Sequence, residues 1–359
     1  MVSPLFLNER EISPKSPPYI IAELSGNHGG SLERALEVIQ AAKDVGVDAL
    51  KIQTYTPDTM TINSDRSDFQ ISKGLWKGRS LYDLYAEAHT PYEWHEQMFS
   101  FARKIGITIF STPFDETAVD LLESLNAPAY KIASFELVDI PLIRYVATKG
   151  KPIILSTGMS DVTEIEHALV TAKEAGCNDL AILHCISGYP TPLEEANLSL
   201  ISKLQSKFKV NVGLSDHTTG TMASVIATAL GATIIEKHFT LSRAQGGVDS
   251  EFSLEPKEMK ELIIQCRKTK RAMGTGAFKR KNLELENKVF RRSLYFVEDI
   301  PSGETIKSHH IRRIRPGFGL SPRFLSKVIG KRLKKDVLKG ERVTAELVGL
   351  NVDQDNQNT

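Results

Sequence analysis

Several common sequence features are absent from this chain of 359 residues, and each absence excludes a class of protein. The three cysteines (Cys177, Cys185 and Cys266) form no CxxC pair and no even framework, which excludes a disulfide-stapled fold and a zinc ribbon. No apolar run reaches the roughly 18 residues of a membrane span. The first residues, MVSPLFLNEREISPKSPP, lack the basic start and apolar centre of a signal peptide. The cytoplasm is therefore the expected compartment.

Net charge is also nearly absent overall, at +1, but it is unevenly distributed. Residues 289–350 contain 14 Lys and Arg against 6 Asp and Glu, a net charge of +8. Such a basic segment suits an anionic substrate, an acidic partner surface or nucleic acid. It lacks interleaved aromatic residues and any recognised nucleic-acid motif, so nucleic acid is not an expected partner.

Apolar, strand-like runs alternate with helical stretches between Tyr19 and Ala272. The eight runs are found in YIIAEL, DALKIQ, ITIFST, AYKIAS, PIILST, LAILHC, VNVGL and ATII. Continuous apolar runs are typical of parallel strands that helices cover on both faces. Eight such units over about 250 residues predict an α/β fold, a (β/α)8 TIM barrel. A doubly wound open sheet is the alternative, but the GxGxxG turn that it needs is absent after Glu23.

The pattern changes after the last helical stretch. Residues 1–275 are expected to form the catalytic barrel, and 276–288 to form a linker. Residues 289–350 contain short strand and turn signals, including GERVTAELV, and predict a small β-rich domain. A module of roughly 60 residues is small for an independent domain, so support from the barrel or another subunit is expected. The tail, 351–359, is polar and is expected to be disordered.

Polar side chains end or follow every predicted strand, where TIM barrels build their active sites. They are Glu23, Lys51, Gln53, Thr112, Lys131, Ser134, Ser156, Ser187, Tyr189, Ser215, His217, Glu236 and His238. Lysines and hydroxyl groups together favour a phosphate or carboxylate site. The alternative for either lysine is an ion pair with Glu23 or Glu136 that neutralises the barrel mouth.

Two histidines close the last two predicted strands. Residues two apart share a face of a strand, so Ser215 lies with His217 and Glu236 with His238. The two imidazoles therefore converge, which suits a divalent transition metal. Ordinary loop histidines are the alternative reading. A Schiff-base aldolase with Lys131 as nucleophile also stays open, although that chemistry needs no metal.

The motifs of the chain resemble those of the sialic acid synthase family. The resemblance runs from about Ile20 to Val348 and rests on AELSGNHGG, STPFD, YKIASFE, LSTGM, GLSDHT, IEKHFTLSRAQGGVDSEFSLEP and IRPGFGL. It includes a C-terminal domain similar to type III antifreeze protein, a SAF domain. KIQTYTPDTMTI and LYDLYAEAHTPYEWH favour the branch of the family that makes pseudaminate.

This resemblance implies a reaction and a set of roles. Phosphoenolpyruvate would condense with an N-acetylated sugar to give a nonulosonic acid and phosphate. The implied phosphoenolpyruvate ligands are Lys51, Thr112, Lys131, Ser134, Ser156, Ser187 and Ser215. Mn²⁺ or Mg²⁺ would be held by His217 and His238, and Glu23 would handle a proton or stabilise a cation. The implied sugar ligands are Gln53, Glu136, Tyr189, Asp249 and Arg315. Arg315 would act across a homodimer in which the C-terminal domain covers the partner's site.

One residue departs from the pattern that the resemblance implies. Sialate synthases of this family typically have an asparagine in the loop after the sixth strand, where this chain has Ser187 in HCISGYP. Serine still donates one hydrogen bond, so phosphate binding is retained while the sialate reading is weakened. Legionaminate and sialate precursors stay open as acceptor sugars. A pure ice- or glycan-binding module is also open, but it would not need a complete barrel.

Overall fold

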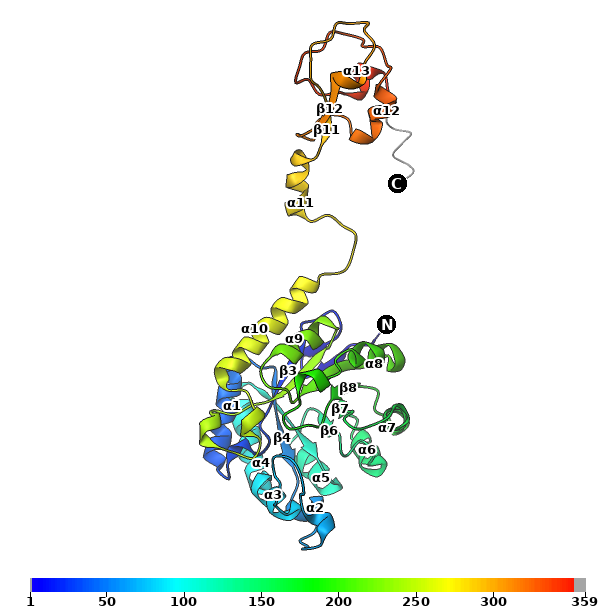
Figure 1. The fold of residues 1–359 in the computed structure, drawn as a ribbon. Coiled ribbons are helices and arrows are strands. Elements are labelled where there is room, and N and C mark those ends of the chain that lie inside the picture. Colours follow the sequence, from blue (N-terminus) through cyan, green and yellow to red (C-terminus); the bar gives the residue numbers. More distant parts are fainter. Residues whose placement is uncertain (1, 352–359) are drawn as a thin grey trace. The chain divides into compact units, whose positions relative to one another are not determined.

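The computed structural model describes residues 2–351 (Figure 1). The chain divides into two compact units, Met1–Gly274 and Thr275–Thr359. Of the predicted disordered tail, all but Asn351 lies outside the described residues. No helix within residues 2–351 is both long and apolar enough to cross a bilayer. Cys177, Cys185 and Cys266 are free and buried.

The first unit is a closed parallel barrel, which confirms the predicted fold. Its strands follow one another in chain order and the last pairs with the first, in the order β3 (Tyr19–Glu23), β4 (Ala49–Thr54), β5 (Thr108–Pro113), β6 (Tyr130–Ile132), β7 (Ile153–Ser156), β8 (Leu180–Cys185), β9 (Asn211–Asp216) and β10 (Ile234–His238).

Helices connect successive barrel strands. They are α1 (Leu32–Val45), α4 (Tyr92–Ile105), α5 (Glu116–Ser124), α6 (Ile140–Ala147), α7 (Val162–Glu174), α8 (Leu200–Phe208) and α9 (Met222–Ala229), and α10 (Pro256–Met273) follows β10. The polar insertion after β4 contains α2 (Pro57–Met60) and α3 (Leu81–Ala88). Short 3₁₀ turns lie at Ser25–His28, Ser67–Phe69, Leu193–Glu195, Arg243–Gln245 and Ser250–Phe252.

Local sequence sets the ends of these helices. Ser31 precedes α1, and its side chain accepts a hydrogen bond from the Arg34 backbone N–H. Asp161 caps α7 in the same way, with Glu164 completing a capping box. Gly46 ends α1 with φ of 86°, a left-handed conformation that glycine adopts without steric cost. Pro91 is the N-cap of α4.

The barrel interior changes from apolar to polar along the strands. Near the strand starts it is packed with side chains such as Tyr19, Ala49 and Ile234. A hairpin of β1 (Leu5–Leu7) and β2 (Arg10–Ile12), which the sequence pattern did not predict, adds apolar side chains to this cluster. It therefore covers this end of the barrel and leaves the other end for polar groups. Within β9, a Cβ on Gly213 would lie 2.4 Å from the Ile234 carbonyl oxygen, so only glycine fits there.

The second unit has its own small core. β11 (Ser293–Phe296) pairs antiparallel with β12 (Ile311–Ile314), and Leu294, Phe296 and Val337 are among the buried side chains. Short helices α11 (Asn282–Glu286), α12 (Leu325–Val328) and α13 (Ala345–Val348) and 3₁₀ turns at Asn287–Phe290, Ser308–His310 and Pro322–Phe324 complete it.

Two local expectations for this region differ from the structure. Within GERVTAELV, the last four letters before Gly349 form helix α13 rather than a strand, because the Thr344 hydroxyl accepts a hydrogen bond from the Leu347 N–H and caps the turn. Helix α11 also lies inside the segment 276–288 that was expected to be a plain linker.

Candidate active site

The strand ends bring most of the predicted polar residues into one layer. Parallel pairing sets Glu23 on β3 beside Lys51 on β4 and beside His238 on β10. In the same way, Ser215 on β9 lies beside Glu236 on β10. Residues in register on neighbouring strands point to the same face, so these side chains share the barrel interior. Glu23, Lys51, Lys131 and Ser215 are buried.

Two lysines and two glutamates form a buried charge network. Lys51 Nζ lies 2.7 Å from Glu23 Oε2 and 3.7 Å from Glu236 Oε1. Lys131 Nζ lies 3.5 Å from the same Glu236 oxygen. The Ser215 hydroxyl donates to that oxygen at 3.2 Å, and Lys51 donates to Thr112 Oγ1 at 3.1 Å. Both lysines thus have carboxylate partners, as the ion-pair alternative anticipated, although Lys131 pairs with Glu236.

Burial and these pairings shift the pKa values of Glu23, Glu236 and Lys131. Burial raises the pKa of Glu23, and Lys51 only partly offsets this. Burial also opposes ionisation of Glu236, but Lys131 and Lys51 outweigh it and its pKa is lowered. Burial lowers the pKa of Lys131 despite the nearby Glu236. Glu23 is therefore the carboxyl group of the network that is best suited to carrying a proton.

His217 and His238 face each other with ring centroids 5.3 Å apart. His217 Nδ1 lies 3.0 Å from the Ile186 carbonyl oxygen, so this nitrogen donates. Burial opposes protonation of His217, but Cys185 and the Ile186 carbonyl outweigh it, and the pKa of the ring is raised. Burial, followed by the neighbouring positive groups, holds the pKa of His238 well below its ordinary value. Its buried Nδ1 has no hydrogen-bond partner among the described residues and lies 3.7 Å from Asp249 Oδ2. A divalent metal ligates the neutral form of imidazole, which the lowered pKa of His238 favours and which His217 reaches by releasing a proton.

Hydroxyl groups surround the backbone at Gly158, two residues after the end of β7. A Cβ at this position would lie 2.4 Å from Ser187 Oγ and 2.7 Å from Ser134 Oγ. The Gly158 N–H donates to Ser134 Oγ at 3.1 Å. Ser156 Oγ is buried without a hydrogen-bond partner in the described part of the chain. The absence of a side chain at Gly158 therefore leaves a small cradle of donors suited to an anion.

Five predicted residues remain: Gln53, Tyr189, Asp249, Glu136 and Arg315. Gln53 donates to Glu23 Oε1 at 3.1 Å, and the Tyr189 ring lies 4.5 Å from that of His217. Asp249 is buried and accepts a hydrogen bond from Ser25. Burial raises the pKa of Glu136 to about 7. Arg315 lies in the second unit, directly after β12, and is exposed.

Sequence reasoning missed four residues of the site. Ser25 has φ of 47°, and its hydroxyl bridges Gln53 and Asp249. Its position in the loop SGNHGG was the available signal. Cys185 was noted only as a strand end, yet its sulfur lies 3.8 Å from His217 Nδ1. Burial opposes its ionisation, but His217 brings the pKa of the thiol to about 7. The ring centroids of Phe252 and His238 are 4.9 Å apart, and those of Trp76 and Tyr189 are 5.6 Å apart.

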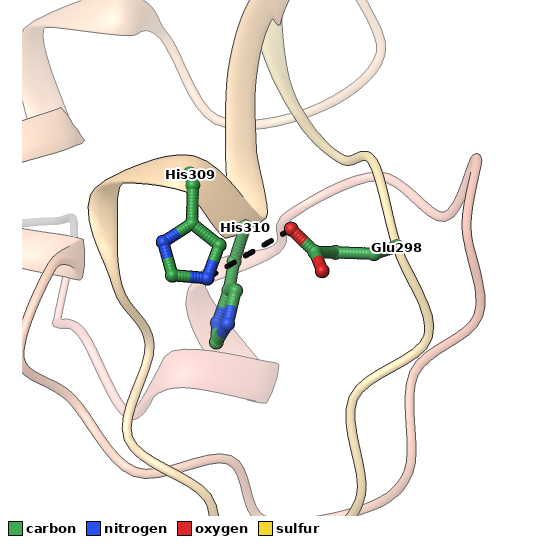
Figure 2. A group of neighbouring side chains, drawn as sticks. All are labelled: Glu298, His309 and His310. Atoms are coloured by element: carbon green, nitrogen blue, oxygen red, sulfur yellow. Dashed lines mark ion pairs between the residues drawn. The ribbon is translucent and has the colours of Figure 1, made fainter.

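A second group of possible metal ligands lies on the second unit (Figure 2). Glu298, His309 and His310 have ligating atoms within 4.8 Å of one another, and His309 lies 4.0 Å from Glu298. His310 Nδ1 accepts a hydrogen bond from the Lys307 N–H, so its Nε2 carries the proton. Metal binding there would require that bond to break. No lysine or hydroxyl cradle like that of the barrel was found among the described contacts of this group.

Comparison with known proteins agrees with the two-unit organisation. The model of the NeuB family matches residues 38–278, and that of the SAF domain matches residues 291–348. A pseudaminic acid synthase from Campylobacter jejuni is 47% identical over 323 residues, which cover 90% of this chain and 94% of that protein. A pseudaminic acid synthase from Helicobacter pylori is 43% identical over 321 residues, covering 89% and 94% respectively.

A solved structure is similar over most of the chain. The N-acetylneuraminic acid synthetase from Leptospira borgpetersenii, determined in complex with citrate, is 32% identical. It aligns with a TM-score of 0.73 and covers 80% of this chain and 95% of its own. The match to the NeuB family, residues 38–278, contains strands β4 to β10 of the barrel.

Proposed function

The chain belongs to the NeuB family, and from this premise we propose that it is a pseudaminic acid synthase. It condenses phosphoenolpyruvate with 2,4-diacetamido-2,4,6-trideoxy-L-altrose and water, giving pseudaminic acid and phosphate. The observation that carries this proposal is the 47% identity over 90% of the chain, together with a buried layer of two lysines, hydroxyl groups and two facing histidines. The alternative is a legionaminate or N-acetylneuraminate synthase that uses the corresponding N-acetylated hexose.

Phosphoenolpyruvate binds through the lysines and hydroxyl groups of the polar layer. The proposed ligands are Lys51, Thr112, Lys131, Ser134, Ser156, Ser187 and Ser215. Lysine supplies point charge and serine supplies directional donors. The unpartnered Ser156 Oγ and the cradle around Gly158 support this placement.

Substitution of Gly158 by alanine tests the cradle. Its φ is not in the left-handed region, so the backbone accepts alanine, but the new Cβ forces Ser134 and Ser187 to turn away. We expect the KM for phosphoenolpyruvate to rise about tenfold to 100-fold, the loss of one or two hydrogen bonds to a charged group. Initial rates measure this effect. Gly188→Ala, in the neighbouring loop, is the matched control, and an equal rise in both variants would contradict the cradle.

His217 and His238 are the proposed metal ligands. Their available nitrogens and the nearby Asp249 carboxylate fit a divalent cation, and the Nδ1–H bond from His217 to the Ile186 carbonyl fixes its tautomer. When bound, Mn²⁺ or Mg²⁺ supplies Lewis-acid polarisation of the sugar's aldehyde oxygen.

The other side chains orient the substrates. C3 of phosphoenolpyruvate attacks the aldehyde carbon of the open-chain sugar, water adds at C2, and phosphate leaves. Glu23, whose pKa burial raises, handles a proton or stabilises the cation at C2. Gln53, Glu136, Tyr189 and Asp249 contact the sugar. We expect a cytoplasmic setting, where thiols such as those of the three free cysteines stay reduced.

A panel of acceptor sugars tests the proposed activity. Phosphate release from phosphoenolpyruvate is measured with the diacetamido-trideoxy-altrose, with the legionaminate precursor and with N-acetylmannosamine, each with and without added Mn²⁺. The first sugar is expected to give the highest kcat/KM. A higher value for another sugar selects the alternative, and release without any sugar contradicts the synthase proposal.

The second unit completes the site of a partner subunit in this proposal. Residues 289–350 carry a charge of +8, and Arg315 is exposed. Phe278 and Leu283 in the linker, and Phe290 at the start of this domain, are exposed in the single chain, as expected of apolar groups that a second copy covers. Arg315 then donates to the acetamido oxygen of the sugar bound by the partner, and the domain excludes water.

Mixed dimers test this arrangement. Arg315→Ala chains and His217→Ala chains are each expected to have little activity. A mixed dimer has one site with both residues intact, so activity returns towards half that of the wild type per mixed dimer. Subunit exchange is verified with differently tagged chains. No recovery after verified exchange would mean that the domain covers its own barrel.

A further inference from the structure

A fully buried ion pair lies beside the two histidines but outside the polar layer. Asp216 on β9 and Lys237 on β10 are in register, with Nζ and Oδ2 3.1 Å apart and both side chains 0% exposed. Side chains alternate along a strand, so these two point outward while their chain neighbours point into the barrel. Charged side chains are rarely this buried unless they are paired.

The pair holds the backbone around His217 from two sides. Asp216 Oδ1 accepts from the N–H and the hydroxyl of Thr218, both at 2.8 Å. Its Oδ2 accepts from Ser224 on α9 at 2.6 Å. Lys237 Nζ donates to the Thr218 carbonyl oxygen. The residue after His217 is thus bound both to Asp216 and, across the strands, to Lys237.

Stability alone is a weak reason for such a pair. Replacing a buried ion pair with apolar side chains of similar volume is often neutral or stabilising, because desolvation offsets the attraction. An apolar replacement would lose the directional hydrogen bonds. These bonds fix the orientation of one strand end and its position along the barrel axis relative to the neighbouring strand, whereas apolar contacts allow small shifts. Asp216 adjoins His217, and Lys237 adjoins His238.

We propose that the Asp216–Lys237 pair is a positioning device that sets the separation and orientation of His217 and His238. Neither residue contacts substrate or metal in this proposal; both act through the strand ends. The inference rests on the proposed function insofar as the two imidazoles share a divalent cation. Groups that orient metal ligands typically change metal affinity by about 10–100-fold when they are replaced.

The test uses apolar replacement of both partners in the full-length protein, with side chains of similar length and branching. Asp216→Leu/Lys237→Met removes the pair without leaving a buried unpaired charge. Mn²⁺ affinity is measured by electron paramagnetic resonance titration, and stability by urea unfolding. Leu169→Ala, a core truncation on α7 away from both strands, is the control for general loosening. We expect about 10–100-fold weaker Mn²⁺ binding in the double variant and unchanged binding in the control.

Further outcomes separate this inference from the metal proposal. Unchanged Mn²⁺ affinity in a folded double variant overturns the inference. If the wild type shows no Mn²⁺ binding that depends on His217, the metal proposal fails. In that case a crystal structure of the double variant tests the positioning inference independently of the metal. Centroids of the His217 and His238 rings that are still 5.3 Å apart with the same tilt overturn the inference, and displaced rings support it. If the double variant does not fold, Asp216→Asn/Lys237→Met, which keeps the aspartate shape, is measured in the same way.

Discussion

Replacing His217 or His238 with alanine is expected to abolish turnover while the barrel stays folded. Both rings lie at the strand ends rather than in the apolar interior, so removing either leaves the packing of that interior intact. Each variant loses one of two proposed metal ligands, and its residual rate should match that of wild-type protein in EDTA. Steady-state phosphate release measures the rate, and circular dichroism measures the fold.

A third buried histidine provides the matched control. His184 on β8 points away from the barrel interior and lies 2.8 Å from the Ala196 carbonyl oxygen. His184→Ala should cost about 1–3 kcal/mol of unfolding free energy through that unsatisfied carbonyl. Its activity and EDTA sensitivity should stay those of the wild type. Full activity of either His217→Ala or His238→Ala, or of wild-type protein in EDTA, would contradict the metal assignment.

The polar layer could be predicted because it depends on local alternation. Along a strand, every second residue faces the barrel, and parallel strands in a closed barrel bring their ends together. Lys51 and Gln53 on one strand, and Glu236 and His238 on another, therefore had to share the interior once the strands were recognised. Pairing of neighbouring strands then set Glu23 beside Lys51. None of these steps requires the conformation of a loop to be known.

The rest of the site depends on contacts between distant loops. Ser25 and Asp249 are 224 residues apart, and their hydrogen bond exists only because two loops meet over the barrel. No short-range pattern carries that information. The hairpin β1–β2 could not be predicted for the same reason, because its apolar side chains are buried only when they pack against the open end of a complete barrel. Helix α13 was missed because a four-residue helix is set by its cap rather than by periodicity.

Two roles are open to Lys131: it is either a ligand of the substrate anion or a structural counter-ion of Glu236. Its Nζ lies 3.5 Å from Glu236 Oε1, which an ion pair explains fully. Glu236 also has Lys51 at 3.7 Å, so the network retains one cation without Lys131. Lys131 is therefore not required to neutralise Glu236, and its ammonium group can bind phosphoenolpyruvate. Its substitution should reveal binding that is similar in the ground and transition states, which appears in KM.

Lys131→Met is accordingly expected to raise the KM for phosphoenolpyruvate about 100-fold, with a much smaller change in the KM for the sugar. Truncating one partner of a buried charge pair costs about 2–5 kcal/mol, and a hundredfold effect corresponds to the lower part of that range. Initial rates are measured with each substrate varied while the other is saturating. Lys151→Met, which removes a partly exposed pair with Glu123, controls for loss of a lysine and should leave both KM values unchanged.

A compensating substitution separates the two roles of Lys131. If the lysine serves only to neutralise Glu236, then Lys131→Met/Glu236→Gln restores the balance of charge and should recover the KM for phosphoenolpyruvate. If Lys131 contacts the anion, removing Glu236 supplies no donor in its place, and the raised KM should persist in the double variant. Recovery, or equal changes in both KM values in the single variant, would make Lys131 a counter-ion. Persistence would leave the anion as its partner, with Glu236 holding the ammonium group in place before phosphoenolpyruvate binds.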